Sequence, residues 1–225
     1  MERYYMNQMF DFLRELAVNN NREWFHAHKA RFQALRECWI SDVDRLLGLF
    51  SQAYPELRGL TARDCLYRIY RDTRFSADKT PYKTFLSAAF MQGGRKSPYA
   101  GLYVHVSPFD DGDSGLYGGI WCPEAPILKK LRHAIVDNIE EWEDIVNEPV
   151  LKQNFEVITT ERLKTAPKGW DKDHPQVEWL RMKDYGWWQG LTPDFFLHPD
   201  WPEKIAEKAV ALRDVISFIN YSIDE

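Results

Sequence analysis

The segment from Arg68 to Lys83 holds the residue types best suited to binding an anion. It has five basic side chains and two acidic ones, a local charge of +3 in a 225-residue chain whose formal net charge is −5. Arginine presents a planar fork of donors that matches phosphate and carboxylate, and lysine adds a mobile point charge. Aromatic residues and a Ser/Thr/Pro turn interrupt these charges, a pattern typical of an anion-binding loop. The predicted ligand-binding residues of the segment are Arg68, Arg71, Asp72, Arg74, Lys79 and Lys83.

The same charges have an alternative interpretation that needs no ligand. Either Arg71 or Arg74 would pair with a nearby aspartate and thereby fix the turn. The aspartates within reach along the chain are Asp72 and Asp78. A regular strand over 65–73 would place Arg68 and Asp72 on one face and Arg71 on the other, because side chains alternate along a strand. The spacing leaves both interpretations open.

His105 is the candidate catalytic residue. Leu102, Val104 and Val106 alternate with Tyr103 and His105, so the strand has one apolar face and one polar face. A histidine on the polar face titrates near neutral pH and is suited to acid/base catalysis. The alternative is a hydrogen-bonded histidine with a structural role. In either case we expect His105 to point away from the layer that the three apolar residues bury.

A second polar loop, over 163–175, adds two further ligand-binding candidates. Lys168 and His174 lie there among Pro and Gly residues that restrict the backbone. Loops of this kind often border binding sites because a rigid scaffold positions them. An ordinary surface loop would have the same composition.

Several classes of protein and site are not indicated. The sequence contains no phosphate-binding P-loop, no dinucleotide-binding glycine motif and no zinc-protease or serine-hydrolase motif, so no cofactor is expected. Cys38, Cys65 and Cys122 are scattered, which predicts free thiols, no bound metal and a reducing, cytoplasmic location. No signal peptide or membrane span is indicated. The mild net acidity disfavours non-specific binding to nucleic acid.

The hydrophobic pattern predicts one α+β domain over residues 1–225, with an antiparallel sheet of about five strands covered by three long helices. A shorter helix is expected over 6–18. The three long helices are expected at 22–53, 124–146 and 202–221. The strands are expected at 66–73, 85–91, 99–107, 116–121 and 183–189. Short Gly- and Asp-rich turns join the middle three strands, which predicts an antiparallel meander.

Five motifs in this order resemble the bacterial and fungal family catalogued as DUF2461, a domain of unknown function. They lie at 19–29, 68–83, 100–105, 118–124 and 163–175, so the resemblance covers nearly the whole chain. Two differences are a missing third glycine before Gly118-Gly119 and a cysteine at 122 where the family usually has methionine. The resemblance implies a single domain and brings no established activity.

Two functional hypotheses follow from these residues. The first is recognition of a small phosphate- or carboxylate-bearing ligand at the strand ends by the basic segment, with hydrolysis or transfer as the reaction class if the protein is an enzyme. The alternative is a non-catalytic interaction module that docks an acidic partner protein. A pocket uniting Arg71, His105 and Lys168 would favour the first. A flat basic face with Arg71 paired to an aspartate would favour a partner or a structural role. The sequence assigns no oligomeric state.

Overall fold

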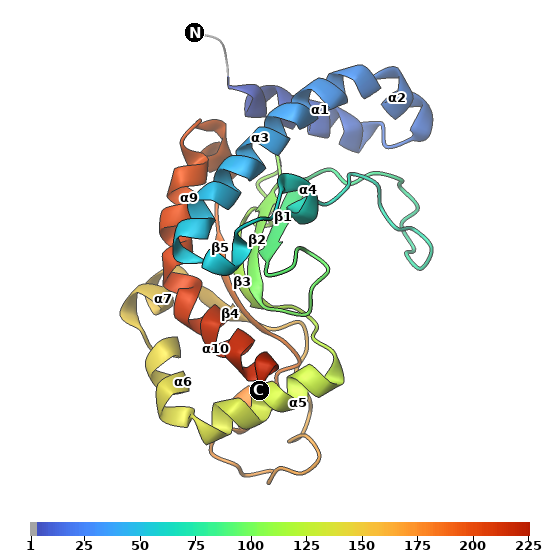
Figure 1. Ribbon diagram of the computed structural model, residues 1–225. Helices are drawn as coiled ribbons and strands as arrows, with labels where there is room; N and C mark the ends of the chain where they lie inside the picture. Colours follow the sequence, from blue (N-terminus) through green and yellow to red (C-terminus); the bar gives the residue numbers. More distant parts are fainter. Residues whose placement is uncertain (1–3) are drawn as a thin grey trace.

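A five-stranded antiparallel sheet organises the fold. The computed structural model describes residues 4–225. The strands follow the order β1-β2-β3-β5-β4 across the sheet, so the last two strands cross over in sequence (Figure 1). Their bounds are β1 Leu86–Met91, β2 Gly101–Val106, β3 Gly115–Ile120, β4 Glu156–Ile158 and β5 Tyr185–Gly190.

The predicted meander is confirmed. β1, β2 and β3 are adjacent and antiparallel, with Ser87 opposite His105 and Tyr103 opposite Tyr117. The predicted strand over 66–73 is wrong, since this stretch makes only isolated bridges, and the fifth strand is the short β4 instead. One physical reason is Pro81, which faces Arg71 and lacks the N–H that a regular ladder requires.

The helices range in length from four residues in α4 and α8 to 25 residues in α3. Their bounds are α1 Tyr5–Val18, α2 Arg22–Ala27, α3 Lys29–Ala53, α4 Ala62–Cys65, α5 Ala125–Asp137, α6 Ile139–Val146, α7 Pro149–Asn154, α8 Val177–Leu180, α9 Trp201–Ala209 and α10 Arg213–Asp224. Three 3-10 turns join them, η1 Pro55–Leu57, η2 Pro193–Leu197 and η3 Val210–Leu212. Within the described residues, no helix has both the length and the apolar character needed to cross a membrane.

The three predicted long helices are only partly confirmed, because each is interrupted. The first breaks at His28, whose ring stacks on Trp24 and donates from Nδ1 to the Trp24 carbonyl at 2.8 Å. The second breaks at Asn138, whose side-chain amide donates to the Ala134 carbonyl at 3.0 Å. Such side chains compete with the backbone for helix hydrogen bonds. The third passes through η3 between α9 and α10.

One face of the sheet is apolar and packs against the helices. Phe90 of β1 meets Phe50 of α3 edge-to-face, and α9 and α10 contact β3. Trp142 of α6 is fully buried against Trp187 of β5. Figure 1 shows α3, α9 and α10 together on this side. This layer is the core of the protein.

The opposite face carries aromatic and small residues, and we call it the aromatic face. The register places Tyr103, His105, Tyr117 and Trp188 on it, and His105 points away from the apolar layer as predicted. Glycines on neighbouring strands leave room for the rings. A Cβ added at Gly186 would overlap the ring of Tyr117, and one at Gly115 would overlap Trp188. The rings therefore lie flat across the sheet.

Candidate functional site

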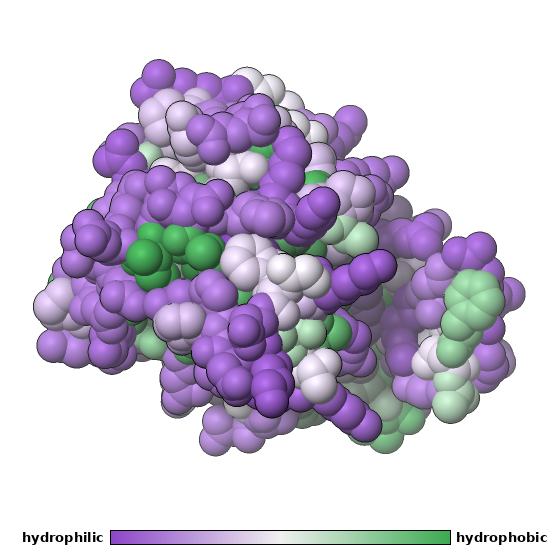
Figure 2. Space-filling model, turned by 90° about the horizontal axis from the view of Figure 1, so that it is seen from below, coloured by the Kyte–Doolittle hydropathy of each residue, from purple (hydrophilic) through white to green (hydrophobic). Residues whose placement is uncertain are grey.

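Residues 66–85 form an arm that leaves the sheet beside β1. It is an irregular two-stranded ribbon, held by backbone bonds from Lys83 N to Ile69 O (2.7 Å) and from Arg71 N to Pro81 O (2.9 Å). Figure 1 shows the arm projecting from the body, and Figure 2 shows it standing away from the rest of the surface. The basic segment therefore occupies a projecting ribbon, with its root at the sheet and its tip in solvent.

The root of the arm is fixed by the corner between α1 and α2. Asn20 donates to the Tyr82 carbonyl at 2.9 Å and accepts from the Tyr82 N–H at 3.1 Å. The Tyr82 ring stacks on Phe25 with centroids 4.1 Å apart. Asn21 caps α2 by accepting from Trp24 N. The role of Asn20 in holding the arm was not predicted from the sequence.

The arm tip, residues 71–80, neutralises most of its own charge. Arg74 makes a two-pronged contact with Asp72, at 3.0 Å from Nε and 2.6 Å from Nη2. Arg71 pairs with Asp78 and also donates to Thr80. Lys79 donates to the Thr73 carbonyl at 2.9 Å. Arg71 and Arg74 are thus both paired with aspartates, as in the interpretation of this segment that needs no ligand.

These pairs lower the pKa of both aspartates to about 2. For Asp72 the main cause is the hydrogen bond from the Arg74 side chain. For Asp78 it is the hydrogen bond from Arg71, followed by the Thr80 backbone N–H. A lowered carboxyl pKa stabilises the folded arm above the ordinary value of 3.8, and this contribution is lost as the pH falls through about 2.

We expect crossed effects when either arginine is replaced. Arg74→Gln should return the pKa of Asp72 towards 3.8 and leave that of Asp78 near 2, whereas Arg71→Gln should do the reverse. Side-chain carboxyl resonances followed by NMR during acid titration measure both values. Two aspartates that respond equally to either variant would contradict separate pairs.

Arg68 and Lys83 at the arm root are unlike the tip residues. Within residues 4–225, neither side chain has a hydrogen-bond or ion-pair partner. The Lys83 ammonium is half-buried between two rings, 5.0 Å from the centroid of Tyr67 and 5.4 Å from that of Phe85. Burial lowers the pKa of Lys83, and the neighbouring Arg68 lowers it further. The root therefore holds two cations, neither of which is paired with an acid within the described residues.

His105 lies on the aromatic face next to this root. Its ring stacks on Phe85 with centroids 4.2 Å apart, and its Nδ1 shares a hydrogen bond of 2.9 Å with the Tyr103 hydroxyl. Burial lowers the pKa of His105. Asp113 and Asp111 oppose that effect, while Lys83 adds to it. At neutral pH the imidazole is accordingly uncharged and able to accept or donate a proton.

Lys168 and His174 lie elsewhere, in the loop beside α5. His174 accepts from Gln176 N at 3.0 Å and packs edge-on against Trp170. Trp170 in turn packs on His133 of α5. The structure brings Arg68, Lys83 and His105 together, and it places Lys168 and His174 in a separate loop.

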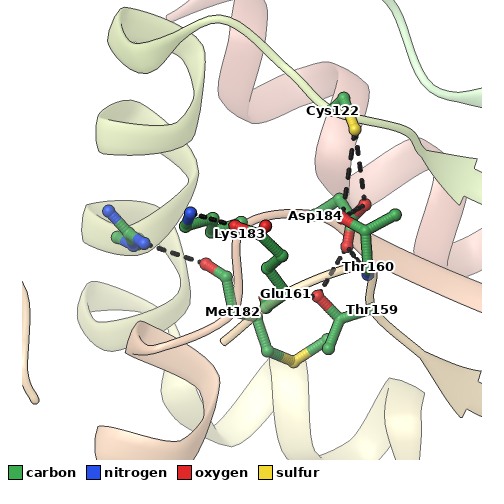
Figure 3. A network of polar contacts seen from close by, with 8 residues as sticks. Cys122, Thr159, Thr160, Glu161, Met182, Lys183 and Asp184 are labelled. Carbon is green, nitrogen blue, oxygen red and sulfur yellow. Dashed lines mark hydrogen bonds and ion pairs between the residues drawn. The ribbon is translucent and has the colours of Figure 1, made fainter. Parts of the chain in front are cut away.

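A polar network lies at the other end of the aromatic face (Figure 3). Asp184 is only 1 % exposed and accepts from Thr159 Oγ1 (2.5 Å), Thr160 N (2.8 Å) and Thr160 Oγ1 (2.6 Å). The Cys122 thiol lies 3.8 Å from the same carboxylate. This network ties the 159–160 loop to the start of β5, so Asp184 has a structural role.

A pocket of about 510 Å³ opens beside this network, and a second of about 590 Å³ lies between α5, α6 and α10. Neither is lined by a residue of the arm root or by His105. In the first, Lys183 is paired with Glu161 and Arg132 donates to the Met182 carbonyl. The second is lined by Glu141, Asp214 and Glu225 without a basic residue, which is unsuited to an anion.

A metal or disulfide site is not formed by the described residues. No group of three or more His, Cys, Asp or Glu side chains in 4–225 is arranged to hold a metal ion. The three cysteines are free thiols, with Cys65 buried and Cys38 and Cys122 exposed. Cys122 combines a positive φ of 46° with contacts to Asp184 and Thr160. It adds a weak thiol donor to the network.

Comparisons with known proteins identify the chain by family alone. No curated protein and no solved structure shows significant similarity to it. The model of one family, described as a conserved hypothetical protein (DUF2461), matches residues 8–218. This range contains the arm and the whole sheet, together with the helices except the start of α1 and the end of α10. The chain belongs to the DUF2461 family.

Proposed function

We propose that the protein binds a small phosphate- or carboxylate-bearing ligand at the root of the arm, through Arg68 and Lys83. His105 lies beside this site as the group able to accept or donate a proton. A reaction there would be hydrolysis or transfer at the anionic group. The observation that carries the proposal is the half-buried Lys83 ammonium without an acid partner within residues 4–225.

The reason is electrostatic. A charge withdrawn from water is unfavourable unless an opposite charge or hydrogen bonds compensate it. The faces of Tyr67 and Phe85 supply only part of this compensation through cation–π contacts. Arg68 adds a second unpaired positive charge next to Lys83. An anion placed between them would satisfy both, whereas the arginines of the tip already have aspartates.

The small opening beneath the arm gives the shape of the site. A crevice of about 20 Å³ lies between the arm root and α3 and is lined by Arg68, Lys83 and Phe85. This is room for about one water molecule. The ligand is therefore expected on the outer surface of the root, where Arg68 is exposed, and not enclosed beneath it.

Thermal shift tests the proposal. At fixed ionic strength, a phosphate or small carboxylate at a hundredfold excess over its Kd should stabilise the protein by about 2.7 kcal/mol. For a chain of this length that is a rise of about 5–11 °C in Tm. Lys83→Met removes the charge and keeps much of the side-chain volume, and should abolish the rise. Arg74→Gln is the matched control and should retain it, because Arg74 is already paired with Asp72.

Two results would contradict the proposal. One is a broad screen in which no anion raises the Tm of the wild-type protein. The other is an equal rise in wild type and Lys83→Met. Either result would leave the alternative, an interaction module that docks an acidic partner protein through the arm. That alternative is favoured by Phe75 at the arm tip, whose side chain is 95 % exposed beside Arg74.

A further inference from the structure

We infer that Lys83 is a nucleophilic amine that forms an imine with a ligand carrying both an anionic group and a ketone or aldehyde. The inference rests on the proposed anion site and names the class of ligand it would take. Arg68 would hold the anionic group, and Lys83 would attack the adjacent carbonyl carbon. The geometry that points to this role is a lysine held between two aromatic rings, beside a second cation and without an acid partner within residues 4–225.

The surroundings of Lys83 differ from those of the lysines that are paired with acids. Lys204 pairs with Asp200 at 3.0 Å, and Lys183 pairs with Glu161. A carboxylate partner stabilises the charged ammonium, and an ammonium has no lone pair with which to attack a carbonyl. Lys83 has no such partner within residues 4–225 and has the rings of Tyr67 and Phe85 instead.

An apolar site and a neighbouring cation both favour the neutral amine of a lysine. Both conditions hold at Lys83, where burial is the larger cause of the lowered pKa and Arg68 the second. The phenyl ring of Phe85 also stacks on His105, whose Nδ1 shares a hydrogen bond with the Tyr103 hydroxyl. A group able to take up and return a proton therefore contacts the same aromatic ring as Lys83.

The reaction needs no oxidant or reductant. The Nζ lone pair forms a bond to the carbonyl carbon, and the π electrons of that carbonyl move to its oxygen. Proton transfer then gives a neutral carbinolamine. The carbon–oxygen bond breaks as the nitrogen lone pair forms the C=N bond, and the oxygen leaves as water with the two hydrogens of the original amine. In this scheme His105, which stacks on Phe85 beside Lys83, carries protons between nitrogen and oxygen.

Reductive trapping with pyruvate tests the inference. Pyruvate carries a carboxylate next to a ketone, and cyanoborohydride converts an imine into a stable secondary amine. Peptide mass spectrometry should then find Lys83 heavier by the mass of the acid less one oxygen atom. We expect more label on Lys83 than on Lys79, because the lowered pKa of Lys83 leaves more of its amine neutral and able to attack. Lactate, which has a hydroxyl in place of the ketone, should give no label.

Two variants make the result specific. Lys83→Arg keeps the positive charge and removes the nucleophile, so it should lose the label and still be stabilised by phosphate. Lys79→Arg is the matched control on the same arm, since Lys79 bonds only to a backbone carbonyl. It should keep the label on Lys83. The Tm of each unliganded variant establishes that it is folded.

The outcomes separate this inference from the function it rests on. If phosphate raises the Tm of wild type but Lys83 is labelled no more than Lys79, the imine is excluded and anion binding stands. If neither phosphate nor lactate raises the Tm and Lys83 is not labelled, both fail. Labelling of Lys83 that is lost in Lys83→Arg, together with retained stabilisation of that variant by phosphate, supports both.

Discussion

Gly119→Ala is expected to destabilise the protein by more than about 4 kcal/mol, a large part of the total stability of an ordinary domain. Gly119 lies near the end of β3 with φ at +140°, a conformation that residues with a Cβ rarely adopt. An added Cβ would also overlap the carbonyl oxygen of Tyr185 on the neighbouring strand. Neither atom can move without disturbing the pairing of β3 with β5, because the Cβ is fixed directly to the β3 backbone and the oxygen belongs to the β5 backbone.

Matched variants separate the cost of the positive φ from the cost of the overlap with the Tyr185 carbonyl. Gly112→Ala also places a Cβ at a positive φ, +81°, but nothing lies within 4 Å of it. It should cost only about 1–2 kcal/mol for the backbone conformation. Gly118→Ala has an ordinary φ and would meet the end of the Leu212 side chain at 2.7 Å, which can shift. Urea unfolding should show a larger loss of stability in Gly119→Ala than in either Gly112→Ala or Gly118→Ala. A Gly119→Ala loss no greater than that of Gly112→Ala would show that β3 and β5 can separate to make room.

The sheet was largely predictable because its signals are local. The alternation in β2 and the short Gly- and Asp-rich turns determine both the meander and the direction of His105. The strand β4 was missed because three residues, Glu156–Ile158, are too few to show a period. The predicted strand at 66–73 failed for a different reason. Its partner run contains Pro81 and its outer half is charged, so it forms a ribbon away from the sheet.

The helix interruptions and the site needed information beyond periodicity. Asn138 and His28 end helices through bonds to carbonyls four residues earlier, and such bonds change no apolar spacing. For the basic segment, the composition showed seven charges but not their pairing. Only the folded arm separates the paired arginines of the tip from the unpaired Lys83. The stacking of Lys83, Phe85 and His105 depends on how the arm root meets β1 and β2, and no single segment encodes it.

Asp184→Ala is expected to cost about 3 kcal/mol, because each buried group left without its partner costs about 1–3 kcal/mol. The carboxylate is almost fully buried and accepts three hydrogen bonds from Thr159 and Thr160 (Figure 3). Its removal leaves the Thr160 N–H and the Thr160 hydroxyl without this acceptor unless water enters, whereas the Thr159 hydroxyl can still donate to the Glu161 carbonyl at 3.0 Å.

Asp184→Asn should cost less than Asp184→Ala, since its carbonyl oxygen still accepts from Thr160 N while its amide replaces an acceptor with a donor. Asp173→Ala is the control on an exposed carboxylate and should change stability by less than about 0.5 kcal/mol. Urea unfolding of the three variants measures these differences. Because the Asp184 network lies apart from the arm root, the phosphate-induced rise in Tm should be the same in Asp184→Asn as in wild type. An equal loss of stability in Asp184→Ala and Asp173→Ala would mean that water replaces the carboxylate without cost, and that the 159–160 loop is held by its backbone alone.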